Sequence, residues 1–421
     1  MPAAPASASA STGRCPRDRI PGRLAGARPD LVNARLPGCP DPTGWSACPR
    51  SSSPGSSPRW PPRAATPGPP VIDLGRGNPD LPPPAHALAA VAEALGQTAT
   101  PAVHGYPPFD GQRALREAIA RRYAADHGVT LDPDRQVAVV PGTKTAITLL
   151  ALALAQRGDA VLLPDPGYPD YPSGVALAGA RAVALPLEQG AGWQPDWDAV
   201  AAADLAAATV AVLNYPSNPC AVLATDATLR TAVERAHAHG LTLVHDLAYG
   251  FLAFDGRRAR SVLELDGAAD VAVELWSASK VHGMAGWRIG FVVGNAEVVA
   301  RVQLLLDHVH AGVFTALQQG LAAALDGDQS TVTDRAAVYA ARRDRLVAAG
   351  LPGIEAPQGT FYAWWRLPED WSARRLLDRT RVAVAPGEGF GARGAGWARL
   401  SLALPDAELD EALRRLGHAL G

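Results

Sequence analysis

From about residue 71 onward, short apolar runs rich in valine and leucine alternate with longer stretches of helical periodicity. Several runs are apolar throughout, which is typical of strands that are buried on both faces of a sheet. Strands are predicted at residues 137–140, 160–164, 182–187, 209–213, 241–245, 271–276 and 288–293. Helices are predicted among them, for example at residues 111–127, 143–156 and 227–239. This alternation predicts an α/β fold in which helices cover a mostly parallel sheet.

The pattern changes in the last third of the chain. One long helix is predicted at residues 296–325. After Gly350, strands are predicted at residues 360–367, 382–385 and 398–404, with helices at 372–380 and 406–420. These elements predict a smaller α+β domain. Because 421 residues exceed one ordinary core, we predict a large domain at residues 101–310 and a small domain formed by residues 71–100 and 311–421.

Residues 1–70 show no periodic apolar pattern. They hold nine arginines, three aspartates and 16 prolines, with no lysine or glutamate. Such a segment buries too little apolar surface to offset the entropy of ordering, so we predict that it is disordered. No apolar run long enough for a secretory signal follows Met1. We interpret the segment as a dispensable extension, or as the result of a start codon that was assigned too far upstream. The alternative is an organelle transit peptide.

Charge and cysteine content narrow the range of functions. A net charge of −2 gives no general attraction to nucleic acid or to a membrane surface. No stretch approaches the roughly 20 apolar residues of a membrane span. Cys220 is the only cysteine after residue 70, so we expect no disulfide framework and a cytoplasmic location. The histidines lack carboxylate or cysteine partners at metal-binding spacing, and no metal site is predicted.

Lysine is almost absent from the chain. Against 37 arginines there are two lysines, Lys144 and Lys280. An amine can lose its proton, attack a carbonyl and form an imine, whereas a guanidinium stays protonated. Because the chain uses arginine for nearly every positive charge, its two lysines are candidates for amine chemistry. The competing interpretation is that both are surface residues without such a role.

Polar residues follow four of the predicted strands. They are Gly142-Thr143-Lys144, Asn214 to Pro219, Asp246 to Tyr249 and Ser277 to Lys280. Ligands of open α/β sheets bind at the carboxyl ends of the strands, so these four clusters are expected to meet at one edge.

Together the clusters fit an aromatic aldehyde phosphate. Lys280 is expected to form an imine with the aldehyde, and Asp246 is expected to keep the pyridine nitrogen protonated. Tyr249 and Asn218 are the expected donors to the ring oxygen, and Tyr168 is the expected stacking ring. The expected phosphate ligands are Gly142 and Thr143 at a helix N-terminus, Ser277 and Arg288, with Lys144 near the phosphate or a substrate acid.

The stretch Ser277 to Gly290 reads SASKVHGMAGWRIG. It resembles the S-x-S-K-x-x-x-M-x-G-W-R-I-G segment of fold-type I, class I/II aminotransferases that use pyridoxal phosphate. The resemblance runs from about Val71 to the C-terminus. Within the family, the motifs of this chain look most like those of the diaminopimelate-type bacterial aminotransferases. The resemblance implies a three-layer fold with a mostly parallel, seven-stranded sheet in the large domain, and it places the Schiff-base lysine on Lys280.

The resemblance also implies residues for the substrate and for a partner subunit. Arg399, in Trp397 to Leu402, matches the arginine that holds the substrate α-carboxylate, and Asn218 is expected to be a further substrate-binding residue. Gly77 lies in the segment Leu74 to Asp80, which resembles the family's N-terminal loop that closes over the substrate, and it is expected to contact the substrate. Tyr106 matches a tyrosine that reaches the neighbouring site of a homodimer. Ala221 replaces the usual glycine of the turn after Asn218, which is expected to alter that turn.

The predicted function is transfer of an amino group between an L-amino acid and a 2-oxo acid. The alternative within the fold is a pyridoxal phosphate β-lyase of the cystathionine β-lyase type, which would use the same residues. A transcription regulator needs a helix-turn-helix module, for which residues 1–70 show no helices. A serine β-lactamase lacks the downstream Lys-Thr-Gly, and a nucleotide-binding loop lacks its spacing.

Overall fold

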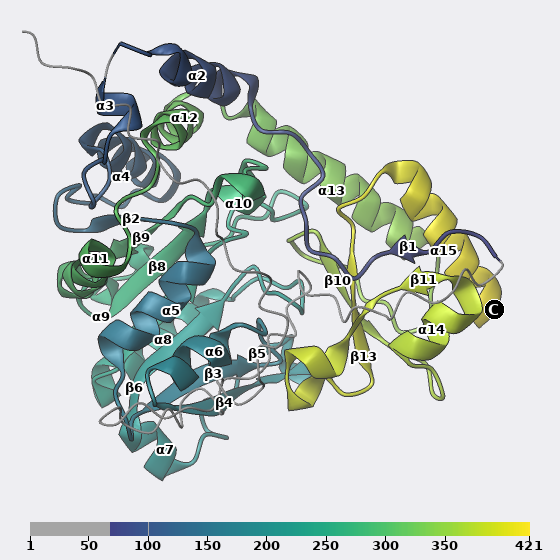
Figure 1. Ribbon diagram of the computed structural model, residues 1–421. Helices are drawn as coiled ribbons and strands as arrows, with labels where there is room; N and C mark the ends of the chain where they lie inside the picture. Colours follow the sequence, from purple (N-terminus) through teal and green to yellow (C-terminus); the bar gives the residue numbers. More distant parts are fainter. Residues whose placement is uncertain (1–67, 100) are drawn as a thin grey trace, which may run out of the picture. The chain divides into compact units, whose positions relative to one another are not determined.

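The computed structural model describes residues 68–99 and 101–421, all of which belong to the compact unit Thr43–Gly421 (Figure 1). The prediction of disorder for residues 1–70 lies, apart from residues 68–70, outside these described residues. Among the described helices, none is both long and apolar enough to cross a membrane.

The central sheet has eight strands in the order β2-β9-β8-β7-β6-β3-β4-β5. Strands β4, β3, β6, β7 and β8 pair in parallel, whereas β9 is antiparallel to both of its neighbours. The bounds are β2 (Val137–Val140), β3 (Ala160–Asp165), β4 (Arg181–Glu188), β5 (Gln194–Pro195), β6 (Ala208–Asn214), β7 (Thr242–Asp246), β8 (Ala272–Ser277) and β9 (Gly290–Gly294). All seven predicted strands are present. The expected number of seven is wrong by one, because the two-residue β5 is too short to produce a periodic signal.

Helices cover both faces of this sheet, which gives three layers. Side chains of α5, α6 and α11 pack on one face, and those of α4, α8 and α12 pack on the other. The α/β fold with a mostly parallel sheet is therefore confirmed. The helices are α2 (Ala85–Gly96), α3 (Pro101–His104), α4 (Arg113–His127), α5 (Thr143–Leu154), α6 (Tyr171–Leu177), α7 (Ala202–Ala207), α8 (Asp226–His239), α9 (Ala268–Val271), α10 (Ala278–Val281), α11 (Ala296–Val309), α12 (Thr315–Asp326), α13 (Ser330–Ala348), α14 (Ala373–Thr380) and α15 (Asp406–Leu420).

The single long helix predicted at residues 296–325 is wrong. The chain leaves α11 after Val309 and starts α12 at Thr315. Gly312 between them has a φ of 80°, in the left-handed region, and a Cβ there would lie 2.7 Å from Pro107 Cγ. Apolar periodicity continues on both sides of this glycine, so the pattern hid the break.

The C-terminal part builds a separate core around a small antiparallel sheet. Strands β10 (Tyr362–Arg366), β13 (Trp397–Ser401) and β12 (Ala385–Pro386) form this sheet, in the order β10-β13-β12. Strand β1 (Ile72–Asp73) pairs in parallel with β11 (Val382–Ala383). The single strand predicted at residues 382–385 is therefore wrong, since β11 and β12 belong to different sheets. Residues Ile72 and Leu74 pack in the C-terminal core, whereas α2 packs against α12 and α12 against α4.

Candidate functional site

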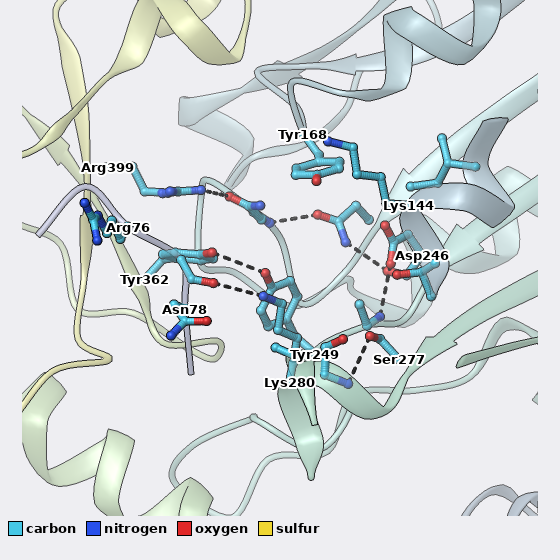
Figure 2. A pocket seen from close by; sticks show the side chains of 18 of the residues that line it. Arg76, Asn78, Lys144, Tyr168, Asp246, Tyr249, Ser277, Lys280, Tyr362 and Arg399 are labelled. Carbon is cyan, nitrogen blue, oxygen red and sulfur yellow. Dashed lines mark hydrogen bonds between the residues drawn. The ribbon is translucent and has the colours of Figure 1, made fainter. Parts of the chain in front are cut away.

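A cavity of about 710 Å³ opens at the carboxyl ends of β6, β7 and β8 and reaches to β10 and β13 (Figure 2). Of the predicted site residues, all but Gly142 and Tyr106 line it, so Lys280 and Asp246 face the same space. The lining residues are Arg76, Gly77, Asn78, Thr143, Lys144, Ile147, Tyr168, Asn214, Asn218, Asp246, Ala248, Tyr249, Ser277, Ser279, Lys280, Ala285, Arg288, Tyr362 and Arg399.

Asp246 is the last residue of β7, and its carboxylate is buried in the floor of the cavity. Its Oδ2 accepts a hydrogen bond from Tyr171 Oη at 2.8 Å, and its Oδ1 accepts one from the Ala248 amide at 3.1 Å. Burial raises the pKa of Asp246 above its usual value, although these hydrogen bonds act in the opposite direction. The two hydrogen bonds therefore hold the carboxylate in place, and a positively charged partner would stabilise its ionised form.

A chain of hydrogen bonds joins the end of β7 to Arg399 (Figure 2). Asn214 donates to the Asp246 carbonyl at 2.9 Å, and its amide oxygen accepts from the Asn218 backbone at 2.8 Å. Arg399 Nη1 donates to Asn218 Oδ1 at 2.8 Å. The guanidinium also lies 4.0 Å from the centre of the Tyr362 ring. Arg399 is 1% exposed, so a buried cation with an ordered fork faces the cavity.

Lys280 lies in the short helix α10, which begins directly after β8. Its Nζ donates to the Gly77 carbonyl at 3.0 Å and lies 5.4 Å from the centre of the Phe361 ring. Burial lowers the pKa of Lys280, and the charges of Arg399 and Arg288 lower it further. The surroundings thus favour a neutral amine, the form that reacts with carbonyls.

Tyr249 and Tyr362 form a pair beside this amine. Tyr249 Oη donates to Tyr362 Oη at 3.4 Å. Burial raises the pKa of Tyr249 well above its usual value. Burial alone would also raise the pKa of Tyr362, but the charges of Arg399 and Lys280 lower it below the usual value. Of the two hydroxyls, that of Tyr362 therefore loses its proton more readily.

The N-terminus of α5 forms the opposite end of the cavity. Its N-cap is Gly142, which has a φ of 86° and no capping side chain. A Cβ at this position would lie 2.4 Å from Arg288 Nη2. Arg288 is held by a bond from its Nη1 to the Ala285 carbonyl at 2.8 Å. A glycine is thus required for the guanidinium to approach the helix N-terminus, where backbone amides attract anions.

The remaining predicted residues differ in where they lie. Tyr168 lines the cavity and packs edge-on against Tyr171, with ring centres 5.4 Å apart. Lys144 also lines it and forms an ion pair with Asp170 at 3.0 Å. Tyr106 does not line the cavity of its own chain and is 86% exposed. Ala221 adopts a φ of 58°, so the left-handed turn persists without the glycine.

Three side chains that form hydrogen bonds within the site were not predicted as site residues. Asn214 lay in a recognised strand-end cluster but was not assigned a role. Tyr171 follows the predicted stacking residue by three positions, and nothing in its local pattern indicated the Asp246 contact. Tyr362 lies in an aromatic run that reads as core, although a Cβ on Gly77 would come within 1.9 Å of its hydroxyl.

Comparison with known proteins identifies the family. A family model described as aminotransferase class I and II matches residues 69–416. This chain belongs to the class I and II aminotransferases. The aminotransferase is 40% identical over 354 residues to the L-glutamine–4-(methylsulfanyl)-2-oxobutanoate aminotransferase of Bacillus subtilis, covering 82% of this chain and 88% of that protein. It is 39% identical over 356 residues to the LL-diaminopimelate aminotransferase of Dehalococcoides mccartyi, covering 83% and 91%.

Solved structures agree with this assignment. The substrate-bound structure of BacF from Bacillus subtilis matches with a TM-score of 0.79 and 38% sequence identity, covering 83% of this chain and 90% of that chain. The predicted fold-type I architecture, the aminotransferase activity and the cofactor pyridoxal 5′-phosphate are confirmed. The aminotransferase moves an amino group between an amino acid and a 2-oxo acid, and the β-lyase alternative is not favoured.

Proposed function

We propose that Lys280 is the catalytic amine of this aminotransferase and that Asp246 and the N-terminus of α5 would hold its cofactor. The supporting observation is that the Lys280 amine and the Asp246 carboxylate face one cavity whose far end is a helix N-terminus with an arginine beside it. An amine, a ring-nitrogen partner and an anion site are the three groups that pyridoxal phosphate needs.

The side chains present fit this cofactor. Asp246 is buried without a cationic hydrogen-bond partner among the described residues, and a protonated pyridine nitrogen would supply one. The amides of the first turn of α5, the Ser277 hydroxyl and the Arg288 guanidinium are donors for a phosphate. Tyr168 lies on the cavity wall, where its ring can cover a flat ligand.

When bound, pyridoxal phosphate supplies an electron-withdrawing ring that stabilises negative charge at the substrate α-carbon. In this proposal Arg399 holds the α-carboxylate with its planar fork. Lys280, with its lowered pKa, then accepts the α-proton and returns it as a general acid and base. Tyr249 would donate a hydrogen bond to the ring oxygen, because its raised pKa keeps the hydroxyl protonated. Asn218 orients Arg399 through its amide oxygen.

We also propose that the enzyme is a cytoplasmic homodimer of amino-acid biosynthesis, divided into a large and a small domain. The exposed position of Tyr106, outside its own cavity, supports a role across a subunit interface. The packing of α2 against α12 and of α12 against α4 favours assigning α2 and α12 to the large domain, so that the small domain would begin after α12 and include β1.

The proposal is tested with a panel of amino donors, each assayed with 2-oxoglutarate and with pyruvate. Amino transfer that depends on the oxo acid and disappears in Lys280→Ala is the expected result. Release of pyruvate from β-substituted amino acids without an oxo acid would instead support the lyase alternative. Full amino transfer by Lys280→Ala would overturn the assignment of the catalytic amine.

A further inference from the structure

The cavity wall holds more positive charge than the proposed cofactor and an α-carboxylate require. Its lining includes four arginine and lysine side chains besides the reactive amine of Lys280, and one carboxylate, Asp246. Arg288 stands at the phosphate end, Arg399 faces the α-carboxylate position, and Lys280 is the reactive amine. Lys144 is paired with Asp170. Arg76 has no part in any of these roles.

Arg76 lines the cavity and lies in the chain between two glycines whose carbonyls contact Arg399 and Lys280. The Gly75 carbonyl accepts from Arg399 Nη2 at 3.0 Å, and the Gly77 carbonyl accepts from Lys280 Nζ at 3.0 Å. An amino acid with its carboxylate at Arg399 and its α-carbon near Lys280 would therefore lie beside the segment that carries Arg76. Figure 2 shows Arg76 on the same side of the cavity as Arg399 and Tyr362.

The Arg76 guanidinium is oriented but not fully used. Its Nε pairs with Asp73 Oδ2 at 2.9 Å, while Asp73 Oδ1 accepts from the Gly75 amide at 2.9 Å. No second acidic side chain of the described residues pairs with Arg76. The side chain of Arg76 is 68% exposed, so this ion pair is weakly held and leaves the terminal nitrogens to a ligand. Those nitrogens form a fork that suits a carboxylate.

We propose that Arg76 is a specificity residue that binds the side-chain carboxylate of a dicarboxylic amino acid or 2-oxo acid. This inference rests on the function proposed above, because it assigns a substrate class to the same site. Two arginines then hold the two ends of the substrate, and the reacting carbon lies between them beside Lys280. The competing interpretation is an exposed arginine that only fastens the loop through Asp73.

The first experiment compares the wild type with Arg76→Gln and with Arg230→Gln. Arg230 is a matched control, because it is an exposed arginine on α8 that also pairs with an aspartate, Asp226. With one amino donor, Arg76→Gln should lose about 10- to 100-fold in kcat/KM for 2-oxoglutarate, as for a lost charge-assisted contact. For pyruvate the change should stay within about threefold, and Arg230→Gln should match the wild type with both acceptors.

The second experiment measures binding without turnover. Titration calorimetry compares glutarate, which has two carboxylates, with butanoate, which has one, on the cofactor-loaded enzyme. Glutarate should bind the wild type at least about tenfold more tightly, and Arg76→Gln should abolish that preference. Equal losses for both acceptors, or an unchanged glutarate preference in Arg76→Gln, would overturn the role of Arg76. An inactive wild type would instead contradict the proposed function, while the calorimetry would still decide on Arg76.

Discussion

The two ends of the cavity differ in how the chain builds them. Asp246 and Ser277 end the adjacent strands β7 and β8 of the central sheet, which are buried on both faces, and Lys280 follows β8 by three residues. At the other end, Arg76 comes from the segment after β1, and Tyr362 and Arg399 come from β10 and β13. The bond from Arg399 to the Gly75 carbonyl joins residues 324 positions apart. The sheet thus fixes the proposed cofactor end, whereas long-range contacts assemble the proposed substrate end.

This difference separates two kinds of failure. Changes at the sheet end should reduce turnover for every substrate, because they act on the shared chemistry. Changes at the assembled end should alter KM and substrate choice first, because they act on the positions of the substrate groups. The following predictions are ordered by the expected size of the effect.

Lys280→Ala should have the largest effect. Loss of the proposed amine should reduce turnover by about 10⁴-fold or more for all substrates, since proton transfer and covalent attachment both depend on it. The measurement is kcat for the best donor and acceptor, with circular dichroism to show that the variant is folded. Loss of turnover with only one class of substrate would contradict the assignment of Lys280 to the chemistry that all substrates share.

Asp246→Asn should be next in size. An amide has no negative charge with which to stabilise a protonated ring nitrogen. The value of kcat should therefore fall by about 10²- to 10³-fold with all substrates, as for loss of one strong electrostatic contact. Asparagine retains the size and one acceptor for Tyr171 Oη, which now bonds to Asp246 at 2.8 Å. Tyr171→Phe is the matched control and should lose far less. Similar losses in both variants would argue that Asp246 acts only through its position.

Arg399→Lys tests the assembled end. A lysine keeps the charge but loses the fork that bonds Asn218 and faces the substrate. The expected result is a rise in KM for amino and oxo acids, with kcat/KM lower by about 10- to 100-fold and a smaller change in kcat. A fall in kcat without a change in KM would indicate that Arg399 acts in the chemical step and does not bind the substrate.

Tyr362→Phe should give the smallest effect, a loss of about two- to tenfold in kcat/KM from one hydrogen bond. Tyr362 raises the pKa of Lys280 and thereby opposes burial and the nearby arginines. Removing its hydroxyl should lower the pKa of Lys280 further, so the neutral amine persists to lower pH. The midpoint of cofactor uptake against pH, measured on cofactor-free protein, should move to lower pH. A shift toward higher pH would contradict this charge assignment.

The sheet end could be predicted from the sequence because its residues follow apolar strands in short contiguous motifs. Asp246 comes directly after one such run and the Ser277 to Lys280 motif directly after another, and the topology rule for parallel sheets brings them together. The strands themselves were found within two residues at each end, since continuous apolar runs leave little ambiguity.

The assembled end could be predicted only in part. Arg399 was found through the family resemblance, but the partners that hold it depend on which distant segments meet, and no local pattern encodes this. Tyr362 was missed because strand β10 is aromatic on both faces, which hides one functional hydroxyl among core side chains. The break at Gly312 and the split after Ala383 were missed for a related reason, because tertiary packing interrupts a locally regular pattern.

The most direct test of the central claim is to find which amine holds the cofactor. Borohydride reduction of the protein loaded with pyridoxal phosphate fixes the link, and peptide mass spectrometry then locates it. The chain has two lysines, so the readout has few alternatives. The account predicts stoichiometric label on the peptide that contains Lys280. Label on Lys144, or no stable label, would contradict it.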